Sequence, residues 1–489
     1  MTTHRAAGHL PPEFVERHSD SFLRNYPFKK PRGYGTIVGM KAHSKGQTGK
    51  RVLLIFLILL LSGCSLEYGD GLLSLPKLPG EYLLLQHEID AILSTGAVYA
   101  TAETGGNRQA VQLVDMDGDG EDEAIAFFRM PGGDFLVCAY QRTADRYEEI
   151  GRAEGFGSSI HAVHYPCVSA DGHLALALSW GLEDASTYGM TVFDITDEGL
   201  ESVLDIQYSS LLVEDMNGDS VDELCFAVRD AVTGGHSLHL YNYSGGGYRL
   251  MGETPLSVEV RSVSLMQFGV TRGGHSAVFV DSAATGGGYI TDVVSLSGGV
   301  AVNETIDMVA GSGAVTWRLV SVSSTDIDGD GIIDVPVAAE PQSGSETQQS
   351  DARYKLHWFD FAQGEEPQAV ATTYHSVAEE WYLMWPDIWG EAVTASRRSF
   401  SGVSRTTFSV SADRMPAEKN SRSLLTICVY TGDNRVSYAV ADGVKIIRQT
   451  ASSIYGYILP ENAPIGYALT DEQVAEIFKL MERDWTAGG

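Results

Sequence analysis

Three short acidic runs share one pattern: Asp115-Met-Asp-Gly-Asp-Gly-Glu-Asp-Glu123, Asp215-Met-Asn-Gly-Asp-Ser-Val-Asp-Glu223 and Asp326-Ile-Asp-Gly-Asp-Gly-Ile-Ile-Asp334. Each places side-chain oxygens at relative positions 1, 3, 5 and 9, and each leads directly into an apolar, strand-like run. In a tight loop, this spacing turns alternate carboxylates toward one centre. A hard cation with about six to eight oxygen ligands, usually Ca²⁺, fits such a centre. The runs therefore predict calcium loops that lead into β-strands.

The sixth position sets the second run apart from the other two. Gly120 and Gly331 occupy it in the first and third runs, and glycine adopts positive φ at little steric cost. The second run has Ser220 there and Asn217 at position 3, so it carries one formal charge less. We expect backbone strain at Ser220 and the weakest metal site in this run.

The EF-hand, another calcium loop, does not fit these runs. It needs a bidentate glutamate at position 12 and a helix on each side. Position 12 is Ala126, Phe226 or Val337 here, and a strand-like run follows each loop. Acidic turns without metal remain an alternative, because Asp, Asn and Gly are ordinary turn residues. Three runs with the same oxygen spacing favour metal loops over that alternative.

The pattern D-x-D/N-x-D-G-x-x-D/E before a short strand resembles the Ca²⁺ loop of FG-GAP or VCBS repeats, as in the integrin α-subunit β-propeller. In that family each loop marks one blade. The resemblance implies side-chain ligands at positions 1, 3, 5 and 9 and a carbonyl ligand at position 7. These residues are Asp115, Asp117, Asp119, Glu121, Glu123, Asp215, Asn217, Asp219, Val221, Glu223, Asp326, Asp328, Asp330, Ile332 and Asp334. The second run departs from the pattern at Ser220, and no clean FG-GAP tripeptides stand between the loops.

The spacing of the runs predicts how the chain is divided. They begin at residues 115, 215 and 326, and a four-stranded propeller blade takes roughly 40–50 residues. Each interval therefore suits two blades, and degenerate units that have lost most or all carboxylates begin near residues 168, 266 and 386. The expected fold is all-β: a β-propeller of about six or seven four-stranded blades over residues 97–420, any seventh being assembled from the termini.

Two helices are expected to flank the propeller. The first is expected at residues 79–96, with Gly96 as the glycine that follows the last helical turn. Its apolar face consists of Tyr82, Leu85, Ile89 and Ile92. The second begins with a capping-box pattern at Thr470 and Gln473. Its apolar stripe consists of Val474, Ile477, Phe478, Met481 and Trp485. Residues 421–489 are expected to form a small segment of strands and a helix.

Residues 40–63 have the layout of a signal peptide. A basic stretch from Lys41 to Arg51 precedes ten apolar residues at 52–61, a run too short for a comfortable membrane span. The ending Leu61-Ser-Gly-Cys64 resembles a bacterial lipobox, which implies that Cys64 is lipidated and starts the mature chain. A buried strand with a structural cysteine is the alternative. Residues 64–78 then form a linker. Residues 1–39 are either an extension before a true start at Met40 or a long, poorly structured leader.

Charge supports this division. Residues 1–63 hold 10 Lys+Arg and 3 Asp+Glu, which leaves 24 basic against 61 acidic residues and a net charge of −37 in the remainder. Such a body repels nucleic acid and anionic lipid surfaces. We expect a monomer in the bacterial cell envelope, lipid-anchored on the outer face of the cytoplasmic membrane, or on the outer membrane if the source has one. No nucleic acid is expected as a partner.

No motif for catalysis stands out. The chain has no P-loop, no GxSxG elbow with partners in order and no HExxH. His161 and His164 are spaced to point to opposite faces of a strand. The four cysteines after Cys64 show no metal spacing, and isolated buried thiols or a Cys138–Cys167 bridge both remain open.

Two hypotheses about function follow. The first is a scaffold that presents its loops to a protein or glycan partner, with structural Ca²⁺. The second is a glycan hydrolase or lyase with its site in the propeller channel, because propellers host many chemistries. The late tryptophans bear on this choice. If exposed, they could stack on sugar rings; if buried, they belong to the blade core, which is the favoured interpretation. They are Trp317, Trp358, Trp381, Trp385 and Trp389.

Overall fold

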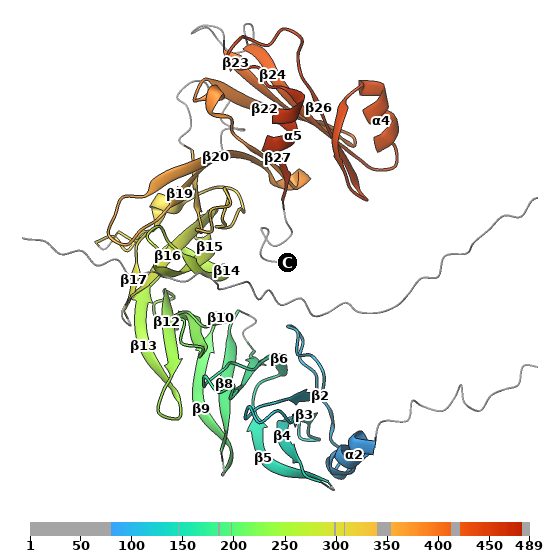
Figure 1. Ribbon diagram of the computed structural model, residues 1–489, viewed down its shortest axis with the longest axis vertical. Helices are drawn as coiled ribbons and strands as arrows, with labels where there is room; N and C mark the ends of the chain where they lie inside the picture. Colours follow the sequence, from blue (N-terminus) through green and yellow to red (C-terminus); the bar gives the residue numbers. More distant parts are fainter. Residues whose placement is uncertain are drawn as a thin grey trace, which may run out of the picture. The chain divides into compact units, whose positions relative to one another are not determined.

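The computed structural model describes residues 80–144, 146–183, 186–196, 198–297, 300–307, 309–339, 354–411 and 421–481. The expected signal peptide, the linker and Cys64 lie outside these residues, as does Trp485. Figure 1 traces the described chain from α2 (Gly80–Leu93) through successive sheets to β27 (Phe478–Leu480). Within these residues, no helix has the length and apolar character needed to cross a bilayer.

The first three sheets follow one another along the chain. The first contains β1 (Val98–Tyr99), β2 (Val111–Val114), β3 (Glu123–Arg129), β4 (Phe135–Arg142) and β5 (Tyr147–Gly155). The second contains β6 (Ser159–His164), β7 (Leu176–Gly181), β8 (Tyr188–Thr196) and β9 (Gly199–Tyr208). The third contains β10 (Ser210–Glu214), β11 (Glu223–Arg229), β12 (His236–Tyr243) and β13 (Tyr248–Pro255).

Three further sheets complete the described chain. The fourth contains β14 (Val260–Val270), β15 (Ser276–Ala284), β16 (Tyr289–Ser297) and β17 (Val300–Asn303). The fifth contains β18 (Val335–Ala338), β19 (Lys355–Asp360), β20 (Gln368–Ser376), β21 (Trp381–Met384) and β27. The sixth contains β22 (Val393–Phe400), β23 (Val403–Ser411), β24 (Ser421–Thr431), β26 (Ser453–Ile458) and β25 (Lys445–Gln449).

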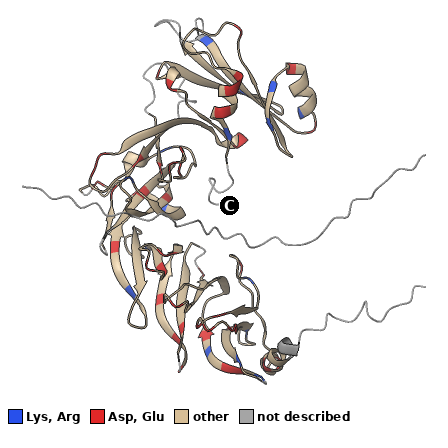
Figure 2. Cartoon of the chain, in the orientation of Figure 1, with Lys and Arg blue, Asp and Glu red and all other residues tan. Residues whose placement is uncertain are grey.

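Every pairing within these sheets is antiparallel, and most neighbours in a sheet are also neighbours in sequence. Six successive meanders of four or five strands are the blade pattern of a β-propeller. The predicted all-β fold with about six blades is therefore confirmed. Acidic residues outnumber basic ones along the described chain (Figure 2), in keeping with its composition.

The central strands are apolar because both of their faces are covered. In β3, Ile125 and Phe127 pack with the second sheet, whereas Ala124 and Phe128 pack toward α2. Side chains alternate between faces along a strand, so a doubly covered strand becomes a continuous apolar run. The strand-like runs after the acidic loops, for example residues 124–128, are such central strands.

Helix α2 forms where the sequence predicts it, with bounds slightly inside the expected residues 79–96. Leu85, Ile89 and Ile92 are buried and pack in one cluster with the alanines of β3. Gly96 has φ 92° and donates its N–H to the Leu93 carbonyl at 3.0 Å, as expected for a glycine after a helix end. This helix covers the outer face of the first sheet.

The C-terminal segment differs from the expectation in two respects. The expected division at residues 420/421 falls inside the sixth sheet, because β24 pairs with β23 over its length. The capping box at Thr470 and Gln473 is present, but α5 (Asp471–Ile477) has only seven residues. The predicted helical stripe is therefore wrong at Phe478 and Met481.

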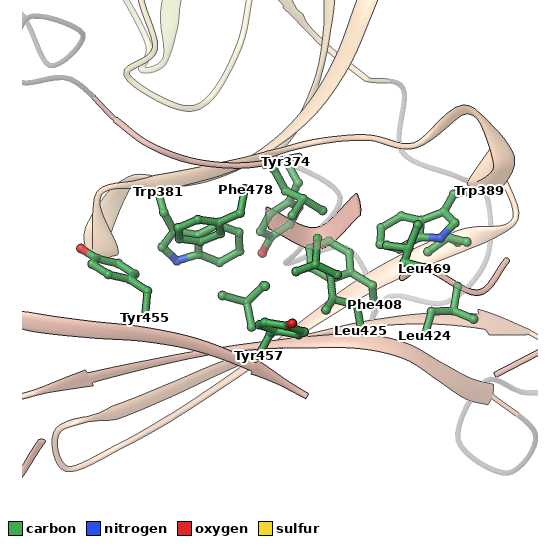
Figure 3. Close-up of a cluster of buried hydrophobic side chains, with 14 of the residues drawn as sticks. Tyr374, Trp381, Trp389, Phe408, Leu424, Leu425, Tyr455, Tyr457, Leu469 and Phe478 are labelled. Carbon is green, nitrogen blue, oxygen red and sulfur yellow. The ribbon is translucent and has the colours of Figure 1, made fainter. Parts of the chain in front are cut away.

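Phe478 explains why the helix stops there. Its ring stacks on Trp381 with centroids 5.7 Å apart (Figure 3), and residues 478–480 pair with β21 as the last strand of the fifth sheet. Pairing satisfies backbone groups at the free edge of β21, and burial of a phenylalanine ring stabilises the fold by about 2 kcal/mol. These non-local contacts outweigh one more turn of helix.

Most of the late tryptophans belong to the core. Trp358, Trp381 and Trp389 are almost fully buried, as the core interpretation predicts. Trp317 is 39% exposed, and Trp385 is half-buried with Lys355 Nζ 4.6 Å from its ring centroid. The unit expected near residue 386 is corrected as well. Residues 385–392 connect the fifth and sixth sheets instead of joining two strands of one sheet.

Candidate metal-binding loops

The three acidic runs form loops with the same register. The residue before each run pairs with its position 9, as Val114↔Glu123, Glu214↔Glu223 and Thr325↔Asp334. Residues 115–123, 215–223 and 326–334 are called the first, second and third loops below. In every loop, the antiparallel pairing brings position 9 back beside the start of the run. That pairing is why residues eight apart in sequence meet.

The first aspartate of each loop organises the turn. Asp115 accepts the N–H of Gly118 at 2.8 Å with one carboxylate oxygen and that of Gly120 at 3.0 Å with the other. Asp215 and Asp326 accept the corresponding N–H groups at 2.7 and 2.8 Å. Such Asx-type bonds fold the loop tightly without any metal.

The carboxylate at position 9 is buried in every loop. Glu123, Glu223 and Asp334 are 2%, 2% and 1% exposed, and each accepts the N–H of position 2 at 2.9–3.0 Å. Burial, with smaller contributions from the nearby loop aspartates, raises the pKa of all three groups, to about 7 for Glu223 and Asp334. Each loop therefore buries one carboxylate beside other acidic groups.

Carboxylate oxygens converge in the first and third loops. Asp115, Asp117 and Glu123 each offer an oxygen within 4.8 Å of the others, and Asp326, Asp328 and Asp334 do the same. These are positions 1, 3 and 9 of the pattern. Asp119 and Asp330 at position 5 are not part of these groups. Over the described part of the chain, no other group of three His, Cys, Asp or Glu side chains meets the same condition.

The first loop also contains an unsatisfied buried oxygen. Glu123 Oε1 has no hydrogen-bond partner among the described residues, although the side chain is almost fully buried. A buried acceptor without a partner costs roughly 1–3 kcal/mol. A cation bound by oxygens of Asp115, Asp117 and Glu123 would satisfy it. The ligand set of this loop thus fits a hard cation.

The second loop differs in backbone and side chains. Ser220 has φ 68°, close to the 90° and 88° of Gly120 and Gly331, which confirms the expected strain at this position. Asn217 Nδ2 donates to Glu223 Oε1 at 2.7 Å and lies 3.1 Å from Asp219 Oδ2. Here an amide lies among the carboxylates.

Each loop contacts the following or preceding sheet. The carbonyl of Met116 accepts the N–H of Leu174, in the connection between β6 and β7 of the second sheet, at 2.7 Å. In the second loop, Asp222 and Cys167 exchange two hydrogen bonds of 2.7 and 2.8 Å, and in the third Ile333 donates to Val270 at 3.3 Å. Sequence reasoning missed Asp222, because its partner lies 55 residues away. The loops therefore join neighbouring sheets.

Other candidate groups do not assemble into a site within the described residues. His161 stacks on Tyr188, and His164 is half-buried with a pKa lowered by burial. Cys138 and Cys167 are free thiols rather than a bridge. A shallow hollow of about 260 Å³ lies beside Trp385, between β20 and the loop that contains Asp387.

Comparisons with known proteins give fold-level similarity alone. No protein-family model matches the chain, and no curated protein sequence matches it. The β-propeller domain of the Trilobed protease from Pyrococcus furiosus is similar at 10% identity and TM-score 0.24, covering 67% of this chain and 93% of that one. The Dos1 propeller has 11% identity, TM-score 0.27 and coverages of 73% and 80%.

A glycan-active enzyme is also among the similar solved structures. The exo-β-1,3-galactanase from Phanerochaete chrysosporium has 7% identity and TM-score 0.24, with 69% of this chain and 80% of that one covered. Solved structures with different activities thus resemble the chain to the same low degree. The fold assignment rests on the sheet topology described above.

Proposed function

We propose that this chain is a calcium-stabilised β-propeller of the FG-GAP/VCBS type that serves as a binding scaffold on the bacterial cell envelope. The observation that supports it most is the convergence of Asp115, Asp117 and Glu123, with a matching cluster in the third loop. Lipid attachment at Cys64 would hold the scaffold at the membrane. Its loops and sheet edges would be offered to a protein or glycan ligand.

The chemistry of the loops favours calcium among the common cations. Their ligands are oxygens alone, which hard cations prefer, and the loops are irregular backbone that tolerates variable coordination. Mg²⁺ demands near-ideal octahedral geometry and keeps several of its waters. The remainder of the chain after residue 63 carries a net charge of −37, so bound divalent ions would also relieve self-repulsion.

The role of the ions would be structural. Because the loops touch neighbouring sheets, an ion that rigidifies a loop also strengthens the contact between two sheets. A site occupied at 100 times its dissociation constant adds about 2.7 kcal/mol to the free energy of unfolding. Two such sites would make a large contribution beside the usual stability of a domain.

A thermal melt tests the proposal. The purified chain is stripped with chelator and titrated with Ca²⁺, with Mg²⁺ as the control ion, while circular dichroism reports unfolding. We expect the melting temperature to rise markedly with Ca²⁺ and much less with Mg²⁺. An unchanged melting temperature would mean that the loops are ordinary acidic turns, and the scaffold proposal would lose its basis.

A further inference from the structure

The second loop satisfies its buried carboxylate in a way that the first does not. Glu123 Oε1 has no hydrogen-bond partner among the described residues, whereas Glu223 Oε1 accepts from Asn217 Nδ2 at 2.7 Å. The same nitrogen lies 3.1 Å from Asp219 Oδ2. In the first loop the position of Asn217 is held by Asp117, which joins the carboxylate cluster. One residue position thus separates a cluster of acceptors from a satisfied hydrogen-bond network.

The orientation of the Asn217 amide is set by the backbone. Its Oδ1 accepts the N–H of Asp219 at 2.8 Å. Turning the amide over would place an NH₂ group against that N–H, so that two donors would face each other. Asp117 meets the same backbone demand with one oxygen, at 3.1 Å from the N–H of Asp119, and has a second oxygen to offer a cation. With its oxygen turned to the backbone, Asn217 presents an NH₂ group to the carboxylates of the loop, where Asp117 presents an oxygen.

The second loop is also held by hydrogen bonds to the neighbouring sheet that form without a metal ion. Asp222 Oδ2 accepts the N–H of Cys167 at 2.7 Å, and the N–H of Asp222 donates to the Cys167 carbonyl at 2.8 Å. The Cys167 sulfur lies 3.1 Å from the Ser169 carbonyl oxygen and 3.4 Å from that of Ser220. The second loop, in the third sheet, is therefore joined to the second sheet by direct hydrogen bonds between protein groups.

We propose that the Asn217 side-chain amide occupies the place that a calcium ion takes in the first and third loops, so that the chain binds two ions rather than three. This inference rests on the proposed function of those two loops. The amide donates hydrogen bonds to two carboxylates where an ion would bind their oxygens. Position 3 of the loop is then the residue that decides between metal and amide.

A reciprocal pair of substitutions tests this inference in the full chain. Bound Ca²⁺ is counted by calorimetric titration with CaCl₂ after chelator treatment, for the wild type, Asn217→Asp and Asp117→Asn. We expect two ions for the wild type, three for Asn217→Asp and one for Asp117→Asn. Without Ca²⁺, Asn217→Asp should melt below the wild type, because a fourth carboxylate replaces the amide.

The possible counts separate this inference from the proposed function. Three ions in the wild type, or no gain with Asn217→Asp, would overturn the role of the Asn217 amide and leave calcium binding intact. No ion in the wild type would overturn the proposed function and the inference with it. If Asn217→Asp does not fold, the wild-type count and the loss of one ion in Asp117→Asn decide the question.

Discussion

At the scale of single residues, the loops show how much depends on one atom or one torsion angle. Positions 3 and 6 distinguish the second loop from the others. Asn217 differs from Asp117 by one donor group in place of an oxygen, and Ser220 adopts a positive φ that Gly120 adopts without cost. The two differences have separate consequences, one for the cation and one for the backbone.

The backbone difference predicts opposite effects of two substitutions. Ser220→Gly should raise the free energy of unfolding by about 0.5–1 kcal/mol, because relief of the left-handed strain exceeds the added entropy of the unfolded chain. Gly120→Ala should lower it by roughly 1–2 kcal/mol, and no heavy atom lies within 4 Å of the added Cβ to contribute a clash. Urea titration of both variants measures this. If Ser220→Gly does not raise the free energy of unfolding and Gly120→Ala does not lower it, position 6 is not strained.

A buried histidine predicts part of the acid sensitivity. The His375 side chain is fully buried, and burial, with a smaller contribution from Arg318, lowers its pKa to about 3. Between that value and the ordinary pKa near 6.5, the unfolded state binds a proton that the folded state does not. Stability from this group is therefore lost as pH falls below about 6.5, by at most ~1.4 kcal/mol per pH unit.

The comparison that isolates this effect is between the wild type and His375→Gln. Free energies of unfolding measured from pH 7 to pH 4 should show a steeper loss for the wild type than for the variant. Parallel curves for the two proteins would show that His375 does not contribute to acid unfolding.

At the scale of elements, local helix signals and contacts with a distant strand favour different structures for the same residues. The capping box starts α5 at Thr470, but the stacking of Phe478 on Trp381 and the free edge of β21 convert the next residues into β27. Local signals therefore decided where the helix begins, and a contact with a strand almost 100 residues earlier decided where it ends.

This competition makes Phe478 a sensitive position. Phe478→Ala removes a buried ring from the aromatic cluster of Figure 3 and should cost about 3–5 kcal/mol of unfolding free energy. Lys479→Ala, at the exposed neighbouring position in the same strand, should change stability by less than about 0.5 kcal/mol. Similar losses for both, measured by chemical denaturation, would mean that β27 is held by its backbone alone.

At the scale of the whole molecule, the loops link local chemistry to the packing of the six sheets. Each loop contacts a neighbouring sheet through backbone hydrogen bonds, and a proposed ion lies in two of them. Metal binding should therefore act on global unfolding rather than on loop motion alone.

An aspartate outside the loops provides the control for this prediction. Asp115→Ala removes turn bonds in both conditions, and in Ca²⁺ it also removes a metal ligand. It should therefore reduce stability by about 2–3 kcal/mol more in Ca²⁺ than in chelator. Asp230 accepts similar turn bonds from Val232 and Thr233 but is not part of a carboxylate cluster. Asp230→Ala should therefore lose the same amount in both conditions. Thermal melts compare the four cases, and equal losses for Asp115→Ala would argue against an ion in the first loop.

The sequence by itself determined what is local. Nine-residue loops that lead into apolar strands, the start of α2 and the capping box at Thr470 follow from neighbouring residues, because turns, caps and alternation act within a few positions. The spacing of the loops predicted about six or seven sheets, but it misplaced the unit near residue 386. The special backbone of Ser220 was visible in the same way, by comparison of position 6 across three runs.

Only the tertiary structure decided what depends on contacts between distant segments. The junction of Cys167 with Asp222, the strand at residues 478–480, the extension of the sixth sheet across residue 420 and the role of residues 385–392 as a link between sheets all depend on partners far away in sequence. Apolar stripes and turn residues do not specify their partners. Burial and backbone pairing select those partners once the sheets are packed, and they override local preference where the two disagree.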